Sequence, residues 1–137
     1  MVVLGDDYLV DMDLGDEEDS LLDVFILEFE ELMDIFKKSL KEIRKLNGDK
    51  KQAYQDIFRV FHTLKGDSGY FTEFGEFTKF ATERCESLRY IDDETVNSGI
   101  MLNQLRIDYS RLSSALAALN KGNSMRAFRF KVFLKNY

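Results

Sequence analysis

Apolar residues recur every three or four positions along four long stretches of the chain, which is the spacing of one face of an α-helix. The stretches cover about residues 20–46, 49–71, 75–91 and 95–119. In the first stretch the repeating apolar residues are Leu22, Phe25, Phe29, Leu32, Phe36, Leu40, Ile43 and Leu46. The pattern predicts four amphipathic helices, the first of them about 40 Å long at about 1.5 Å per residue.

Short polar connections separate the predicted helices. Asn47 and Gly48 form a typical helix end, Asp49 can cap the second helix, and residues 92–95 interrupt the pattern before the fourth. Helices joined by connections this short pack as antiparallel neighbours. The sequence therefore predicts an all-α fold, an antiparallel up-down four-helix bundle with a short fifth segment at the C-terminus.

The two ends of the chain carry opposite charge. Residues 1–19 hold eight acidic residues and no Lys or Arg, whereas residues 121–137 hold five Lys or Arg and no acid. We expect a flexible acidic leader at 1–19, the bundle at 20–120 and a basic-aromatic extension at 121–137. Apolar and polar residues alternate over 127–134, which fits either a short fifth helix or the first strand of a domain missing from this chain.

Charge and residue usage exclude several function classes. A net charge of −6 and a pI near 4.9 argue against binding to nucleic-acid phosphates. One cysteine and one histidine exclude an internal disulfide framework and argue against a structural zinc site. No signal peptide and no bilayer-spanning apolar run is found, so we expect a soluble, cytoplasmic protein without membrane contact. No P-loop or glycine-rich nucleotide lid is found, so we expect no ATP site and no cofactor.

The single histidine, His62, lies on an unexpected face of the second predicted helix. At roughly 100° per residue it falls about 140° from Ile57, the centre of the apolar stripe, and so faces solvent. Gly66 and Gly69 fall on the same side, with Lys65 at its border. Glycine inside a helix costs about 0.5–1 kcal/mol relative to alanine. Two glycines beside His62 therefore indicate a surface kept low so that another macromolecule can reach the imidazole.

The chemistry follows from this placement. An exposed imidazole is a good nucleophile at neutral pH, because much of it is unprotonated. One ring nitrogen can accept a phosphoryl group while the other keeps its proton. Transfer of that group depends mainly on positioning and on charge neutralisation, which the ammonium of Lys65 can supply. The pattern favours phosphoryl transfer over a chance surface histidine.

The segment HTLKGDSG at 62–69 resembles the His-x-x-Lys-Gly-x-x-Gly signature of histidine phosphotransfer (HPt) domains. The resemblance covers about residues 20–119 and implies a four-helix bundle with the signature on its second helix. The long first helix with its acidic flank is most similar to the phosphotransfer domain of chemotaxis-type histidine kinases. In those relatives a Phe-Gly pair commonly follows the signature, and Phe74-Gly75 is similar but comes about two residues later.

The resemblance implies a role for each matching residue. His62 would be the phosphorylated residue, and Lys65 would help to neutralise the phosphoryl group. Gly66 and Gly69 would admit the partner.

Residues outside the signature complete the expected site. In chemotaxis-type relatives a glutamate of the third helix can hold the imidazole proton. Glu86 is the candidate here, and Glu83, one turn earlier, is the alternative. Receiver-type partners commonly dock on an apolar patch around the histidine, to which Phe58 or Tyr54 would belong. Cys85 falls on the apolar stripe and is expected to be a small buried residue.

Together these features predict a histidine phosphotransfer module. It would accept a phosphoryl group on His62 from a histidine kinase or a phospho-receiver and pass it to a receiver-domain aspartate. The expected partners are a kinase catalytic domain and a response-regulator receiver domain. The module would be a monomeric carrier, or the phosphotransfer domain of a longer kinase.

Two alternatives belong to other classes. The first is a non-catalytic helical adaptor that binds signalling partners without phosphorylation. The second is an acid–base enzyme that uses His62 with Glu86, which is weaker because no second histidine, metal set or obvious cleft accompanies them.

Overall fold

The computed structural model describes the backbone of residues 14–122 and the side chains of residues 20–122. Its helical segments, in chain order, are α2 (Leu14–Arg44), α3 (Lys50–Ser68), the 3₁₀ turn η1 (Thr72–Phe74), α4 (Gly75–Arg89), α5 (Asp93–Ser98) and α6 (Ile100–Asn120). The described part of the chain contains no β-strand. The all-α prediction is therefore confirmed for these residues.

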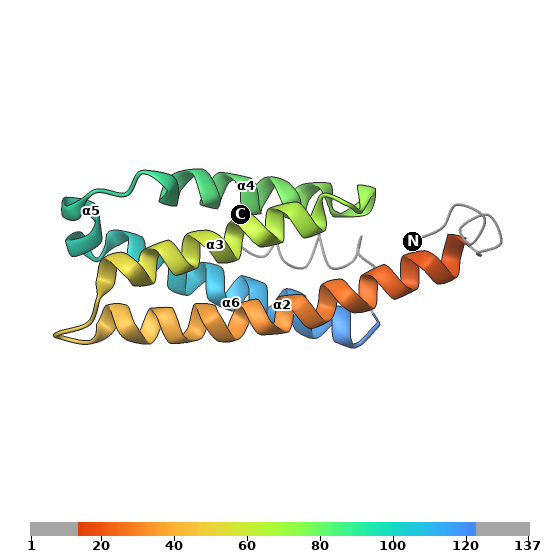
Figure 1. Cartoon of the computed structure of the whole chain (residues 1–137), viewed down its shortest axis with the longest axis horizontal. Coiled ribbons are helices and arrows are strands. Elements are labelled where there is room, and N and C mark those ends of the chain that lie inside the picture. The colour runs from red at the N-terminus through yellow and green to blue at the C-terminus, as the bar shows by residue number, and fades with distance from the viewer. Residues whose placement is uncertain (1–13, 123–137) are drawn as a thin grey trace.

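The four long helices α2, α3, α4 and α6 form an elongated bundle in which successive long helices run antiparallel (Figure 1). α3 packs along both α2 and α4, and α2 also packs against α6. The short α5 turns the chain at the end of the bundle between α4 and α6 (Figure 1). The bundle prediction is confirmed, and α3 has long helices on two sides.

The helix α2 differs from its predicted bounds at both ends. It begins at Leu14, before the expected start near residue 20, and it ends at Arg44. Leu46, expected in the apolar stripe, is 96% exposed because it lies in the turn beyond the helix end. Its assignment to the stripe is wrong. Residues 1–13 of the predicted leader and 123–137 of the predicted extension lie outside the described residues.

The connection from α2 to α3 is held by Asp49. Its carboxylate accepts a hydrogen bond from the Gln52 backbone N–H at 3.1 Å, and its own N–H donates to Glu42 Oε2 at 2.9 Å. The first bond is a standard N-cap, which satisfies a donor that the first turn of a helix leaves free. The prediction that Asp49 caps this helix is confirmed.

The fourth predicted helix is two helices. α5 ends at Ser98 and α6 begins at Ile100, with Gly99 between them at φ 81°. That left-handed conformation is readily adopted only by glycine, and it ends a helix. Asp92 caps α5 by accepting the Thr95 N–H at 2.8 Å. The single helix predicted over 95–119 is therefore wrong, and on one continuous helix Val96 of α5 would lie about 180° from Leu105 of α6.

Phenylalanine rings dominate the core of the bundle. Phe29, Phe36 and Phe61 have no exposed surface. Phe36 of α2 contacts Phe61 of α3 and Tyr109 of α6 edge to face, with ring centroids 5.6 and 5.4 Å apart. Tyr54 is only 1% exposed, so its predicted place on a docking surface is wrong.

A buried ion pair joins α4 to α6. Arg84 Nε donates to Asp108 Oδ2, and Gln104 Nε2 donates to Asp108 Oδ1 at 3.0 Å. Asp108 has no exposed surface. Burial raises the pKa of its carboxyl, and Arg84 and Gln104 act in the opposite direction. Removing Arg84 would leave a buried charge without its partner, which is strongly destabilising.

Replacing Phe36 with alanine should lower the free energy of unfolding by about 3–5 kcal/mol, because it empties a site in the centre of the bundle. Ile35→Ala on the same helix is the matched control. Ile35 is 44% exposed, and its replacement should cost less than about 1 kcal/mol. Urea unfolding followed by circular dichroism measures both losses, and equal losses would contradict the core position of Phe36.

Candidate functional site

His62 lies on the outer face of α3 and is exposed to solvent, as the helical spacing predicts. Phe61, which precedes His62, and Leu64, two residues after it, have no exposed surface. Their burial fixes the rotation of α3 and therefore holds residue 62 outward. The imidazole lies against the ring of Phe58, one turn earlier, with centroids 5.9 Å apart.

The surface next to His62 is open at Gly66. A Cβ atom built at this position would meet nothing within 4 Å, so packing does not demand glycine there. The geometry is different at Gly69, where a Cβ would lie 3.2 Å from the Lys65 carbonyl oxygen. Gly69 is the C-cap of α3, and its N–H donates to that same oxygen at 3.1 Å. A side chain at position 69 would press on this carbonyl oxygen, whereas one at position 66 would meet no neighbouring atom within the described residues.

The helix α3 ends at Ser68, not at residue 71 as the apolar spacing suggested. Ser68 is buried, and its Oγ lies 2.7 Å from Thr78 Oγ1 of α4. Phe71 follows in extended backbone, at φ −106° and ψ 120°, and stacks on Phe74 with centroids 4.5 Å apart. Its ring also contacts Phe25 of α2. Phe71 thus has the spacing of a helical core residue but reaches the core from a turn.

The residues Lys65 and Asp67 of the signature face different neighbours of α3. Lys65 is half-buried and its charge acts on Cys85 of α4, whereas Asp67 contacts Glu28 of α2. The structure places these two charges on opposite borders of the buried face of α3.

The α4 side of the site contains a cluster of charges around a buried thiol. Cys85 is fully buried, as predicted. Burial raises the pKa of its thiol, while the positive charges of Lys65 and Arg89 lower it and Glu86 raises it. Because all three charges act on one sulfur, Lys65 of α3 and Glu86 of α4 lie on the same side of the bundle.

Glu86 is bound to Arg89 in this structure. The guanidinium of Arg89 contacts both carboxylate oxygens of Glu86 at 3.3 Å and lies over the Phe58 ring, 5.4 Å from its centroid. A chain of contacts therefore runs from His62 through Phe58 and Arg89 to Glu86. Within residues 20–122, neither Glu86 nor Glu83 donates to or accepts from the imidazole. The sequence reasoning missed Arg89, although its spacing of three residues from Glu86 is typical of helical ion pairs.

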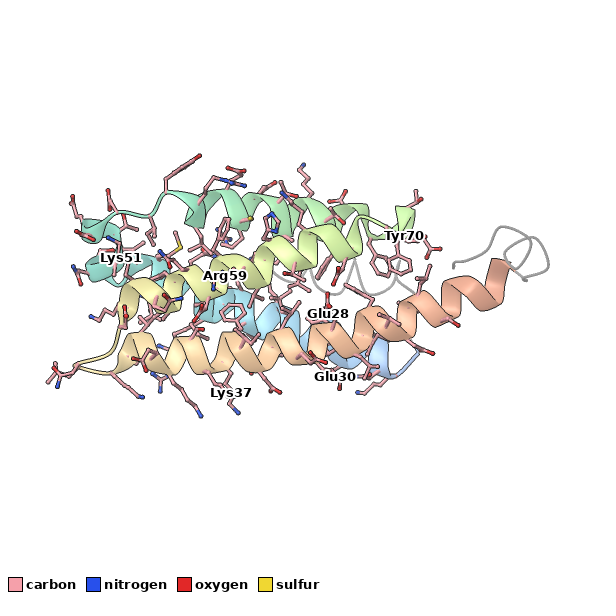
Figure 2. The ribbon with its side chains drawn as sticks, viewed as in Figure 1. Glu28, Glu30, Lys37, Lys51, Arg59 and Tyr70 are labelled. Carbon is pink, nitrogen blue, oxygen red and sulfur yellow. The ribbon has the colours of Figure 1, made fainter. Side chains whose placement is uncertain are left out.

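The α2 side of the site contains a pair of carboxyl groups that the sequence reasoning did not find. Glu28 and Asp67 line the same groove and lie close enough together for their carboxyl groups to interact. Desolvation, followed by hydrogen bonding with Glu28 and the charge of Glu28, raises the pKa of Asp67 to about 7. In Figure 2, Glu28 lies on the side of α2 that faces α3, and Tyr70 lies further along, at the end of α3.

The carboxyl pair borders a groove of about 230 Å³ between α2 and the end of α3. The groove is lined by Leu21, Val24, Phe25, Glu28, Gly66, Asp67, Tyr70 and Phe71. Gly66 belongs both to this groove and to the open surface beside His62, so the groove is continuous with the candidate site.

The described residues offer neither a metal-binding cluster nor a membrane-spanning helix. Among residues 20–122, no group of three or more His, Cys, Asp or Glu could hold a metal ion. None of the helices in the described region combines the length and the hydropathy needed to cross a membrane.

The family model of the Hpt domain matches residues 20–115, which is more than half of the chain and includes the whole signature. No curated protein and no solved structure matches. The match begins where the sequence resemblance begins, and it covers α3 and the surface around His62. The chain belongs to the Hpt domain family.

Proposed function

We propose that this Hpt domain carries a phosphoryl group on His62 between a histidine kinase, or a phosphorylated receiver domain, and a receiver-domain aspartate. Membership of the family makes it a histidine phosphotransfer module of a phosphorelay. The observation that carries the proposal is the exposed imidazole of the only histidine in the chain, beside open space at Gly66.

The reaction needs little from the domain beyond position and charge. A lone pair of one imidazole nitrogen attacks phosphorus, the P–N bond forms, and the P–O bond to the donor breaks with its electron pair leaving on the donor oxygen. The transferred group carries negative charge throughout. We assign its neutralisation to Lys65, which lies one turn after His62 and is half-buried.

We assign the orientation of the imidazole to Glu86. Its carboxylate is exposed, belongs to α4 and shares the charge cluster around Cys85 with Lys65. To accept a hydrogen bond from the imidazole N–H, Glu86 must give up its ion pair with Arg89. That ion pair is exposed and therefore contributes little stability. Glu83, one turn earlier on α4, is the alternative. It is also exposed, and no ion pair holds it in the described region.

The docking surface in this proposal consists of Phe58, Gly66 and Gly69. Phe58 is half-buried, so part of its ring is available beside the imidazole. The partners are a kinase catalytic domain and a receiver domain, and the domain acts as a monomer. The buried free thiol of Cys85 is compatible with a cytoplasmic location.

Phosphorylation should depend entirely on His62. Incubation with phosphoramidate, or with an active histidine kinase and ATP, should label the protein with phosphate that is lost in acid and survives in base. His62→Gln should lose all of this label while keeping its helical circular dichroism spectrum. Label that persists in His62→Gln would contradict the assignment. If the folded wild-type protein is never labelled, the alternative hypothesis of a non-catalytic helical adaptor is supported instead.

Because the space beside Gly66 is open, substitutions there should affect the stability of the fold and the rate of phosphoryl transfer differently. Gly66→Ala should raise the free energy of unfolding by about 0.5–1 kcal/mol, because alanine favours the helix and its Cβ has free space. Gly66→Leu should also fold, but its transfer rate with a receiver domain, divided by its labelling rate with phosphoramidate, should fall at least about tenfold. An unchanged ratio would remove the access argument.

The two glutamates of α4 should differ in their effect on the imidazole. Glu86→Gln should change the balance of the two neutral His62 tautomers, read from ring ¹⁵N shifts, and should slow labelling by about tenfold. Glu83→Gln is the matched control and should change neither. The opposite result would transfer the positioning role to Glu83, and no effect from either variant would exclude this role for both.

A further inference from the structure

The groove between α2 and the end of α3 is a second feature of the site that the phosphotransfer chemistry does not use. Its apolar walls include Val24 and Tyr70, which are 62% and 71% exposed and therefore uncovered. Gly66 connects it to the surface beside His62, one helical turn away. A partner bound over the imidazole would meet this groove.

The charged groups of the groove are all acidic. Its titratable lining groups are Glu28 from α2, Asp67 from α3 and Tyr70 from the turn that follows; α4 and α6 contribute none. Within residues 20–122, no Lys or Arg forms an ion pair with Glu28 or Asp67. Two carboxyl groups at the side of an apolar groove match a cationic side chain with an apolar stem.

We propose that this groove binds an arginine or lysine side chain that the phosphotransfer partner presents, with the stem on Val24 and Tyr70 and the charged head between Glu28 and Asp67. The inference rests on the proposed function, because the partner is the protein that exchanges the phosphoryl group with His62. It adds a docking contact on the α2 side, away from the charge cluster of α4.

The state of the carboxyl pair gives this contact a pH dependence. The pKa of Asp67 is raised to about 7 by desolvation and by Glu28, so at lower pH the pair holds a proton. A bound cation must displace that proton. The affinity for a cation should therefore rise as the pH increases through about 7, and it should be weak at pH 5.5.

The first experiment tests the groove without any partner. Butylguanidinium, a guanidinium on a four-carbon stem, is titrated into the full chain at pH 8 and at pH 5.5, and the backbone amides are followed by NMR. Saturable shifts at Val24 and Gly66 are expected at pH 8, with at least tenfold weaker binding at pH 5.5. Butylurea, neutral and of similar shape, is the control and should bind at least tenfold more weakly at pH 8.

Variants then tie the binding to the carboxyl pair. Glu28→Gln combined with Asp67→Asn should abolish the preference for butylguanidinium over butylurea, whereas Glu30→Gln should keep it. Glu30 is an exposed carboxylate on α2 that does not line this groove (Figure 2). Equal binding of the two probes, or a preference that survives the double substitution, would overturn the proposal.

Two other occupants give different results. If the probe shifts appear only in a chain that ends at Gly122, the groove is filled by residues 123–137 of the chain itself. If the Val24 and Gly66 signals shift with protein concentration alone, a second copy fills it. Either result overturns the assignment to a partner.

The final experiment links the groove to transfer. The transfer rate is measured at pH 8 with a receiver domain that phosphorylates His62, and it is divided by the rate at which phosphoramidate labels the same variant. Glu28→Gln combined with Asp67→Asn should lower this ratio by at least fivefold. An unchanged ratio would overturn the docking role. Absence of any His62 labelling would instead reject the proposed function, and the probe titration would still decide whether the groove binds a cation.

Discussion

The burial of one face of α3 between α2 and α4 is the constraint on which the rest of the site depends. Phe61 and Leu64 have no exposed surface, and complete burial of such side chains contributes about 1.5–3 kcal/mol each. This exceeds the roughly 0.5–1 kcal/mol that Gly66 costs within the helix. The exposed face, which carries His62, can therefore hold an unfavourable residue, because the opposite face supplies the stability of the helix.

The apolar spacing predicted the bundle because core packing dictates that spacing. It failed where the backbone conformation, not side-chain hydrophobicity, decides the outcome. Gly99 adopts a positive φ within a stretch predicted as one helix, and Phe71 has helical spacing but reaches the core from extended backbone. Tyr54 is a different kind of error. It lies only about 60° from Ile57 on a helical wheel, so the same reasoning that placed His62 outside should have placed Tyr54 inside.

Part of the candidate site was predictable because core packing also fixes which residues of a helix face outward. The outward position of His62 and the border position of Lys65 follow from the rotation of one helix. The contacts of Glu86 with Arg89, and of Glu28 with Asp67, depend on side-chain torsions and on how two helices are rotated against each other. A single sequence does not contain that information. Within the signature, Lys65 is therefore directed toward α4 and Asp67 toward α2.

The ion pair between Arg84 and Asp108 has a consequence for recognition. Arg84 lies two residues before Glu86 on α4 and binds a carboxylate in α6 that has no contact with solvent. The helix that carries Glu86 is thus anchored on its far side by an interaction that is costly to break. A protein that binds the His62 face meets a preorganised wall, so less conformational entropy is lost on association and more of the contact energy remains as affinity.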